Sequence, residues 1–152
     1  MKKLLSIALI ASVLFALPAF AADPVVGSWK LNVAKSKFGG APLKAATRVY
    51  TESKGVYTLD QKITGADGKE TSSKASYRNG KEEKQAAAAP ADTVAAKMVD
   101  ANTWDFELKK DGKTIGHVHR VVSADGKTLT VENRGAKLSG AAADETLVFD
   151  KQ

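Results

Sequence analysis

Two histidines, His117 and His119, are the residues of this chain with the clearest capacity for chemistry. They stand two residues apart, the period at which side chains of a β-strand return to the same face, so both imidazoles would project in one direction. Imidazole nitrogens are ligands in many zinc and copper sites. A third ligand would have to come from the next strand, where Glu132 and Asn133 offer oxygens. The pair could therefore bind a metal, or it could be two polar residues that line a wet cavity or its mouth.

The chain offers little else from which an active site could be assembled. It contains no cysteine, which excludes disulfides, thiol nucleophiles and thiolate metal sites together. Serine and aspartate residues near the histidines have simpler roles in turns or on the surface, so no Ser-His-Asp set is evident. The adjacent residues Glu82 and Glu83 would point to opposite faces of a strand and could not flank one substrate. We therefore expect no enzyme activity and no cofactor.

Arg120 and Arg134 are candidate anchors for an anion. A guanidinium group presents several donors in a planar fork that matches a carboxylate or a phosphate. Arg120 follows His119 directly, so in a strand their side chains point to opposite faces. The histidine pair and Arg120 therefore cannot both face the same interior.

A repeated turn pattern indicates the elements that must position these residues. Asp or Asn followed by Gly and Lys occurs between strand-like runs at Asp67-Gly68-Lys69, Asn79-Gly80-Lys81, Asp111-Gly112-Lys113 and Asp125-Gly126-Lys127. Asp and Asn tolerate a left-handed backbone, and Gly adopts positive φ without steric cost, so an antiparallel strand can reverse within a few residues. Successive tight hairpins predict an up-and-down meander.

Apolar residues alternate between the turns, which gives each strand one dry and one wet face. Twisted antiparallel strands lose their exposed edges when the sheet closes on itself, so we predict an all-β fold, a single up-and-down antiparallel barrel of 8–10 strands. Polar residues on the outer faces argue against an outer-membrane barrel. Longer connections are expected at 34–45 and 86–92. Strands are expected near residues 25–33, 46–53, 56–64, 69–78, 81–85, 92–99, 103–110, 113–122, 128–134 and 144–150.

The contents of the interior depend on the register across the Asp125-Gly126 turn. We expect Val121 to pair with Leu129 and His119 with Val131, which would place His117 and His119 inside the barrel and Arg120 outside. A shift of one residue would reverse every side chain. With the expected register, the ligand-binding residues would be Tyr57, Tyr77, Trp104, Phe106, His117 and His119, an apolar pocket with a few polar groups.

The first residues resemble a secretory signal peptide. Met1-Lys2-Lys3 is basic, residues 4–17 form an apolar run, and Pro18-Ala19-Phe20-Ala21 ends in an Ala-x-Ala pattern that favours cleavage after Ala21. The predicted division is a signal peptide at 1–21 and one barrel domain at 22–152, without a transmembrane segment in the mature chain. Loss of two lysines lowers the formal charge from +6 to +4, with no polybasic block that would favour nucleic acid.

The opening residues Gly27-Ser28-Trp29-Lys30-Leu31-Asn32 resemble the Gly-x-Trp start of lipocalins and the first strand of fatty-acid-binding proteins. Together with Arg120-Val121-Val122-Ser123, they also resemble small secreted bacterial lipocalin-like proteins of unassigned function. The resemblance implies a calycin-type barrel closed at one end around Trp29, with a cavity for a small apolar or amphipathic molecule. It also implies a structural motif of Gly27, Trp29 and Arg120, in which the arginine covers the tryptophan if its face turns inward.

The leading functional hypothesis is a periplasmic or secreted, non-enzymatic binding protein for a small hydrophobic or amphipathic molecule. One alternative is a protein-interaction module, such as an inhibitor or an envelope-stress protein, that binds an unknown protein partner through the loops at 34–45 and 86–92. The other is a metal-binding protein that uses His117 and His119.

Overall fold

The structure is a computed structural model, and it describes residues 23–87, 89–135 and 144–152. Ten strands and one 3₁₀ turn lie within these residues, and no helix among them is long and apolar enough to cross a membrane. The elements are β1 Gly27–Leu31, η1 Val33–Lys35, β2 Ala45–Ser53, β3 Val56–Thr64, β4 Glu70–Tyr77, β5 Lys81–Lys84, β6 Thr93–Met98, β7 Thr103–Lys110, β8 Lys113–Val122, β9 Thr128–Arg134 and β10 Glu145–Lys151.

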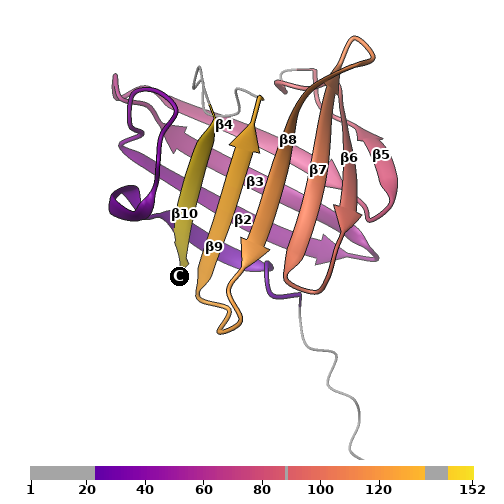
Figure 1. Cartoon of the computed structure of the whole chain (residues 1–152), viewed down its shortest axis with the longest axis horizontal. Coiled ribbons are helices and arrows are strands. Elements are labelled where there is room, and N and C mark those ends of the chain that lie inside the picture. The colour runs from indigo at the N-terminus through magenta and orange to yellow at the C-terminus, as the bar shows by residue number, and fades with distance from the viewer. Residues whose placement is uncertain (1–22, 88, 136–143) are drawn as a thin grey trace, which may run out of the picture.

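The strands form one antiparallel sheet in the order β4-β3-β2-β1-β10-β9-β8-β7-β6-β5. Each strand pairs with its neighbour in sequence, except that β1 also pairs with β10 and no ladder joins β4 to β5. Figure 1 shows the result as two layers, with β10 to β6 in front and β2 to β4 crossing behind them. The predicted all-β, ten-stranded meander is confirmed, and it closes into a nearly complete barrel.

The seam between β4 and β5 is bridged by a side chain. The side-chain amide of Gln85, just after β5, donates to the backbone carbonyl of Ser76 at 2.9 Å and accepts from the backbone amide of Ser76 at 3.2 Å. The side-chain amide of Gln85 thus both donates to and accepts from the backbone of Ser76, as the backbone of a paired strand residue would. One glutamine therefore satisfies part of the open edge of β4.

Tight hairpins join most of the strands, as the Gly-containing turns predict. The exception is Asn79-Gly80-Lys81, which connects β4 to β5 without a ladder between them, so the hairpin predicted there is wrong. At Asp111-Gly112, between β7 and β8, both residues have positive φ, 50° and 71°. Lys54-Gly55, between β2 and β3, repeats this geometry with φ of 52° and 78°. Two successive positive φ values are the geometry of a type I′ turn, whose twist matches that of the flanking strands.

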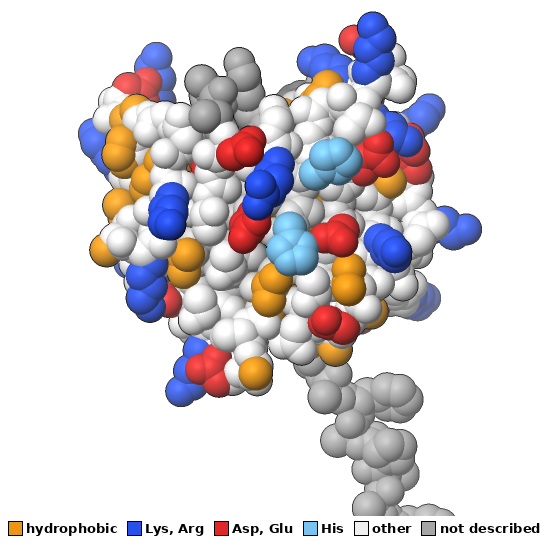
Figure 2. Space-filling model, in the orientation of Figure 1, with side chains coloured by type: hydrophobic (Ala, Val, Ile, Leu, Met, Phe, Trp, Pro, Cys, Tyr) orange, Lys and Arg blue, Asp and Glu red, His pale blue; other side chains and the backbone are white. Residues whose placement is uncertain are grey.

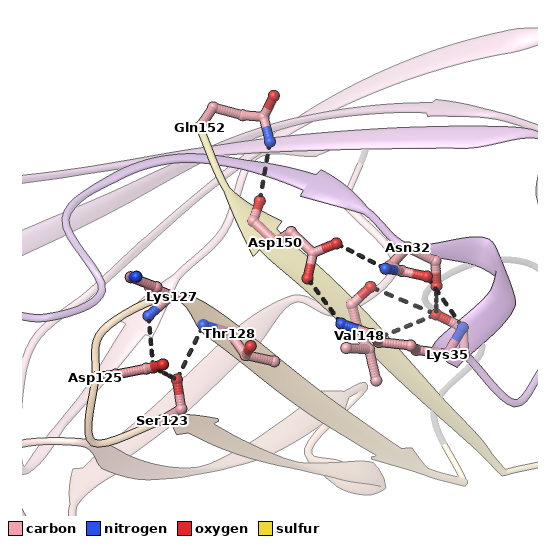
Figure 3. A network of polar contacts seen from close by, with 10 residues as sticks. Asn32, Lys35, Ser123, Asp125, Lys127, Thr128, Val148, Asp150 and Gln152 are labelled. Atoms are coloured by element: carbon pink, nitrogen blue, oxygen red, sulfur yellow. Dashed lines mark hydrogen bonds and ion pairs between the residues drawn. The ribbon is translucent and has the colours of Figure 1, made fainter.

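The connection between β8 and β9 sets the register that decides the interior. The Ser123 hydroxyl accepts from the Thr128 amide at 2.9 Å and donates to Asp125, whose carboxylate also accepts from the Lys127 amide (Figure 3). These contacts stabilise a five-residue turn, and the bond from the Ser123 hydroxyl lowers the pKa of Asp125. The turn leaves Val122, instead of Val121, opposite Leu129.

The expected register across this turn is therefore wrong by one residue. Arg120 pairs with Val131, and His119 pairs with Glu132. Val122 and Leu129 are both buried, so burial of this apolar pair holds the register in place. The consequence is that Arg120 faces the interior, whereas His117 and His119 face solvent.

The closed end of the barrel is packed around Trp29, which is 0 % exposed. Its indole donates to the Val25 carbonyl at 2.7 Å, and the ammonium of Lys151 lies 5.0 Å from its ring centroid. Lys151, and not Arg120, therefore provides the cation over this tryptophan, which corrects the role expected for Arg120. Gly27 has φ of 127°, and a Cβ there would lie 3.3 Å from Lys151 Cε, so glycine fits both the backbone and the lysine stem.

Candidate functional site

A cavity of about 130 Å³ lies inside the barrel between the two layers. Its walls come from β2, β3, β4, β6, β7, β8 and β9, and one side is completed by Gln85 and the segment 89–91. Most of the lining is apolar. Its buried charged residues are Arg48 and Arg120, and the exposed Lys74, which pairs with Asp60, contributes at the edge. The apolar lining residues are Leu59, Ala75, Ala89, Pro90, Ala91, Val94, Phe106, Leu108, Val118 and Val131.

Arg120 is the most deeply buried charged residue of the described chain, with 2 % of its surface exposed. Aromatic rings surround its guanidinium carbon at 5.1–5.4 Å from their centroids, contributed by Tyr50, Tyr77, Trp104 and Phe106. The negative faces of aromatic rings attract a cation, and this attraction is strongest where water is excluded. The aromatic cage therefore offsets part of the cost of burying a permanent charge.

The hydrogen bonds of Arg120 are incomplete. Its Nη1 donates to the hydroxyl of Tyr77, whereas Nε and Nη2 have no hydrogen-bond partner among the described residues. No ion pair in this part of the chain involves Arg120. A buried cation whose donors lack acceptors is costly, and an anion that reached these two N–H groups would remove the deficit.

Arg48 brings a second guanidinium to the same cavity. It is 4 % exposed, its Nε donates to Gln61 Oε1 at 2.6 Å, and its guanidinium carbon lies 4.6 Å from the centroid of the Phe149 ring. Gln61 and Phe149 therefore hold Arg48 in place without neutralising it. The interior therefore carries two cationic groups.

The four aromatic residues predicted as ligand-binding residues do come together. Tyr57 stacks on Tyr77 with centroids 5.3 Å apart, and Trp104 meets the edges of both rings. Phe106 approaches Tyr77 at 5.0 Å. Tyr77 and Phe106 line the cavity, whereas Tyr57 and Trp104 lie behind them in the cluster. Their role as ligand contacts stays a prediction.

The two tyrosine hydroxyls remain protonated. Burial raises the pKa of Tyr77 to about 12, although the charge of Arg120 opposes the shift. Burial, with a hydrogen bond of 2.7 Å to Asp23, also raises the pKa of Tyr57. Tyr77 accepts a bond from Arg120 and keeps its own proton, so it can donate to an anion bound beside the guanidinium.

His117 and His119 lie on the outer face of β8, and the prediction that they line the cavity is wrong. Figure 2 shows both imidazoles on the surface of the layer β10 to β6, among carboxylates. His119 contacts Asp105 at 2.6 Å, and the side chain of Glu132 lies on the same face in the next strand. Asn133, the other oxygen ligand considered, faces the core and donates to Glu145 at 2.8 Å.

No group of three potential metal-ligating side chains occurs within residues 23–87, 89–135 and 144–152. Asp105 and Glu107 of β7 and Glu132 of β9 pair with the two histidines on this face, but the side chains do not converge into the cluster that a metal site requires. Nothing in this arrangement adds to the proposal of a metal centre.

Arg48 and Gln61 are site residues that the sequence analysis missed. A signal was present, because Ala46, Arg48 and Tyr50 alternate through β2 and share its inner face. A charged residue between two inward apolar positions indicates a buried cation when the period of two is taken strictly. Gln61 follows Tyr57 and Leu59 on β3 in the same way.

The ten-stranded meander, the packed tryptophan at one end and the interior cavity define a nearly closed antiparallel β-barrel with space for a small molecule. No family model matches the chain, and no curated protein matches its sequence. Solved structures do match its fold. The fluorescent protein UnaG is 17% identical, with a TM-score of 0.55, over 84% of this chain and 96% of that one.

Two lipid-binding proteins match the fold with similar TM-scores. A Schistosoma mansoni fatty acid binding protein, solved in complex with arachidonic acid, is 12% identical with a TM-score of 0.59, over 85% of this chain and 96% of its own. Apo Caenorhabditis elegans lipid binding protein 8 is 12% identical with a TM-score of 0.60, over 87% and 98%. At these identities the likeness establishes the fold, and the ligand has to be argued from this chain's own cavity.

Proposed function

We propose that this protein binds a small hydrophobic or amphipathic molecule inside its barrel and holds an anionic group of that molecule at Arg120. The observation that carries the proposal is the pair of partnerless N–H groups on a guanidinium that is almost fully buried. Both atoms are buried among the surrounding rings, so these side chains have to shift locally before a carboxylate can accept from Nε and Nη2 in the paired geometry that arginine favours. Tyr77 would add a third donor.

The rest of the cavity suits an apolar body. Leu59, Val94, Leu108, Val118 and Val131 contribute side chains from five strands of both layers. Burial of a ligand's apolar surface against them would supply most of the binding free energy, and the cationic groups would orient the ligand. A protein of similar fold, the Schistosoma mansoni fatty acid binding protein, was solved in complex with arachidonic acid, which supports the binding of an amphipathic molecule.

The proposal includes a binding role without catalysis and an extracytoplasmic location. The cavity lining of the described chain contains cations, hydroxyls and amides, and the imidazoles lie outside it. The described lining therefore offers no imidazole as a general base beside its serines. Export rests on the basic, apolar and Ala-x-Ala regions of residues 1–21. The intact mass of the protein recovered from the periplasm or medium of expressing cells tests it, because cleavage after Ala21 predicts a chain that begins at Ala22.

Binding is tested by calorimetric titration with apolar carboxylates of several sizes, from phenylacetate and hexanoate to palmitate. The wild-type protein should bind at least one of these acids. Arg120→Met should bind the same acid with an affinity that is lower by about tenfold or more, because the carboxylate of the ligand loses a buried charged partner. Arg134→Met is the matched control, because Arg134 is exposed on the outer face and pairs with Glu132. Native mass spectrometry of freshly purified protein should also show a retained small molecule. Failure of every carboxylate to bind, or equal binding by Arg120→Met, would overturn the proposal.

A further inference from the structure

We propose that the ligand of the barrel is compact, a monocarboxylate with one ring or a short chain, and that long acyl chains are excluded. This inference rests on the proposed function and names the ligand class of the same site. It follows from the size of the cavity, the structure of its floor and the attachment of its roof.

The size of the cavity sets the first limit. Its volume is about 130 Å³. An apolar cavity of about 150 Å³ accommodates benzene, whereas pockets for drug-sized ligands measure roughly 300–1,000 Å³. The space therefore fits one ring or a few methylene groups beside a carboxylate.

The floor cannot easily move to enlarge the cavity. Tyr77 and Phe106 form it, and Tyr57 and Trp104 support them in one cluster of ring contacts. The hydroxyl of Tyr57 donates to Asp23. The guanidinium of Arg120 lies among the rings of Tyr50, Tyr77, Trp104 and Phe106. A deeper ligand would have to separate stacked, buried rings and their cation together, which a close-packed core resists.

The roof is tied down on both sides. Ala89, Pro90 and Ala91 line one side of the cavity, and Ala91 is buried. The segment begins at Gln85, whose side chain binds Ser76 and whose amide donates to the Asp92 carbonyl at 2.9 Å. It ends at Asp92, whose amide donates to the Lys109 carbonyl at 2.8 Å. A long chain that projected from the cavity on this side would have to break these bonds.

The polar groups specify the charge of the ligand. Arg120 and Arg48 are cationic, and no acidic side chain lines the cavity within the described residues. An anionic group would find donors without acceptors at Arg120, whereas a cationic group would be buried beside two guanidinium groups without a matching partner. A negative charge on an apolar body of small volume is the combination that the site fits.

The test compares phenylacetate and hexanoate with palmitate by calorimetry on the wild-type protein, with benzyl alcohol as an uncharged analogue. We expect the compact acids to bind about tenfold or more tightly than palmitate, and phenylacetate to bind about tenfold more tightly than benzyl alcohol. Tighter or equal binding of palmitate overturns the size limit and leaves the proposed function standing. Equal affinity for phenylacetate and benzyl alcohol overturns the inference that the ligand carries a carboxylate. If none of the four compounds binds, the proposed function is overturned as well.

An enlarged cavity provides the second arm. Phe106→Ala removes a ring from the floor, so the preferred chain length should shift toward longer acids such as decanoate. Val94→Ala, at a partly buried position of the wall, is the variant to use if Phe106→Ala does not fold. An unchanged preference in a folded, enlarged variant would mean that cavity volume does not select the ligand.

Discussion

Arg120 donates from Nη1 to the hydroxyl of Tyr77 across the interior of the barrel, from β8 to β4. β4 is an edge strand of the sheet, and β8 lies in the opposite layer, so this bond links the two layers beside the cavity. It also orients a buried guanidinium whose Nε and Nη2 have no hydrogen-bond partner in the described part of the chain. The arrangement has consequences for binding, for the pH dependence of stability and for the seam.

Tyr77→Phe should weaken carboxylate binding and destabilise the fold. The substitution leaves Nη1 of Arg120 without its acceptor, and loss of a buried bond to a charged group costs about 1.5–3 kcal/mol. Equilibrium denaturation and calorimetric titration measure the two effects. Tyr57→Phe is the control, because its hydroxyl binds Asp23 and not Arg120, so it should keep the carboxylate affinity. Equal loss of affinity in both variants would show that Tyr77 does not act through Arg120.

Stability should fall at alkaline pH as Tyr77 ionises. Its pKa is about 12 in the folded protein against an ordinary 10.0, so the folded state holds the proton more tightly than the unfolded state. The associated stabilisation is complete below pH 10 and is lost as the pH rises through about 12. A shift of this size corresponds to roughly 2–3 kcal/mol. Tyrosinate absorbance during a pH titration should show late ionisation of both Tyr77 and Tyr57, and Tyr77→Phe should remove the share that belongs to one tyrosine. Normal ionisation of every tyrosine would contradict the prediction.

Gln85→Ala should open the seam between β4 and β5. The variant removes both side-chain bonds to Ser76, so we expect about 1–3 kcal/mol of destabilisation and faster hydrogen exchange at the Ser76 amide. Lys84→Ala is the matched control, because Lys84 is exposed one residue earlier on β5. Hydrogen exchange of the Ser76 amide, measured by NMR, distinguishes the two variants. Unchanged protection of Ser76 in Gln85→Ala would show that the glutamine does not hold the seam.

The double variant His117→Ala/His119→Ala should leave ligand affinity unchanged, because both imidazoles lie outside the barrel. The stability change should be small, about 1 kcal/mol or less, since the contact between His119 and Asp105 is solvent-exposed. Denaturation and calorimetry with the compact acids check both statements. A zinc or copper titration that saturates with wild type and disappears with the double variant would instead favour the metal-binding alternative.

Much of the fold could be predicted because the signals for it are local. The turns at Asp111-Gly112 and Asp125-Gly126 reverse the chain through the backbone freedom of their own residues. The alternation of Trp104, Phe106 and Leu108 marks an inner face whatever the strand pairs with. The aromatic cluster followed from the same rule, because each of its members shares a face with other apolar residues.

The candidate site was less predictable because its central residue depends on a turn of five residues. The hydrogen bonds of Ser123 and Asp125 determine how many residues the turn contains, and the count decides which side of β8 faces inward. Buried arginines were also hard to recognise. At Arg48 and Arg120 the sequence shows a charged residue, but it does not show which aromatic rings will surround that residue in the fold. Tyr50 and Tyr77 approach Arg120 from strands far away in the chain.

The sequence by itself determined the strands, their order around the sheet and the apolar character of the interior, because each depends on neighbouring residues and a period of two. Only the tertiary structure decided that Arg120, and not the histidines, faces the cavity, and that Lys151 covers Trp29. The physical reason is that a register shift of one residue reverses every side chain of a strand, and burial of Val122 against Leu129 selects one of the two registers.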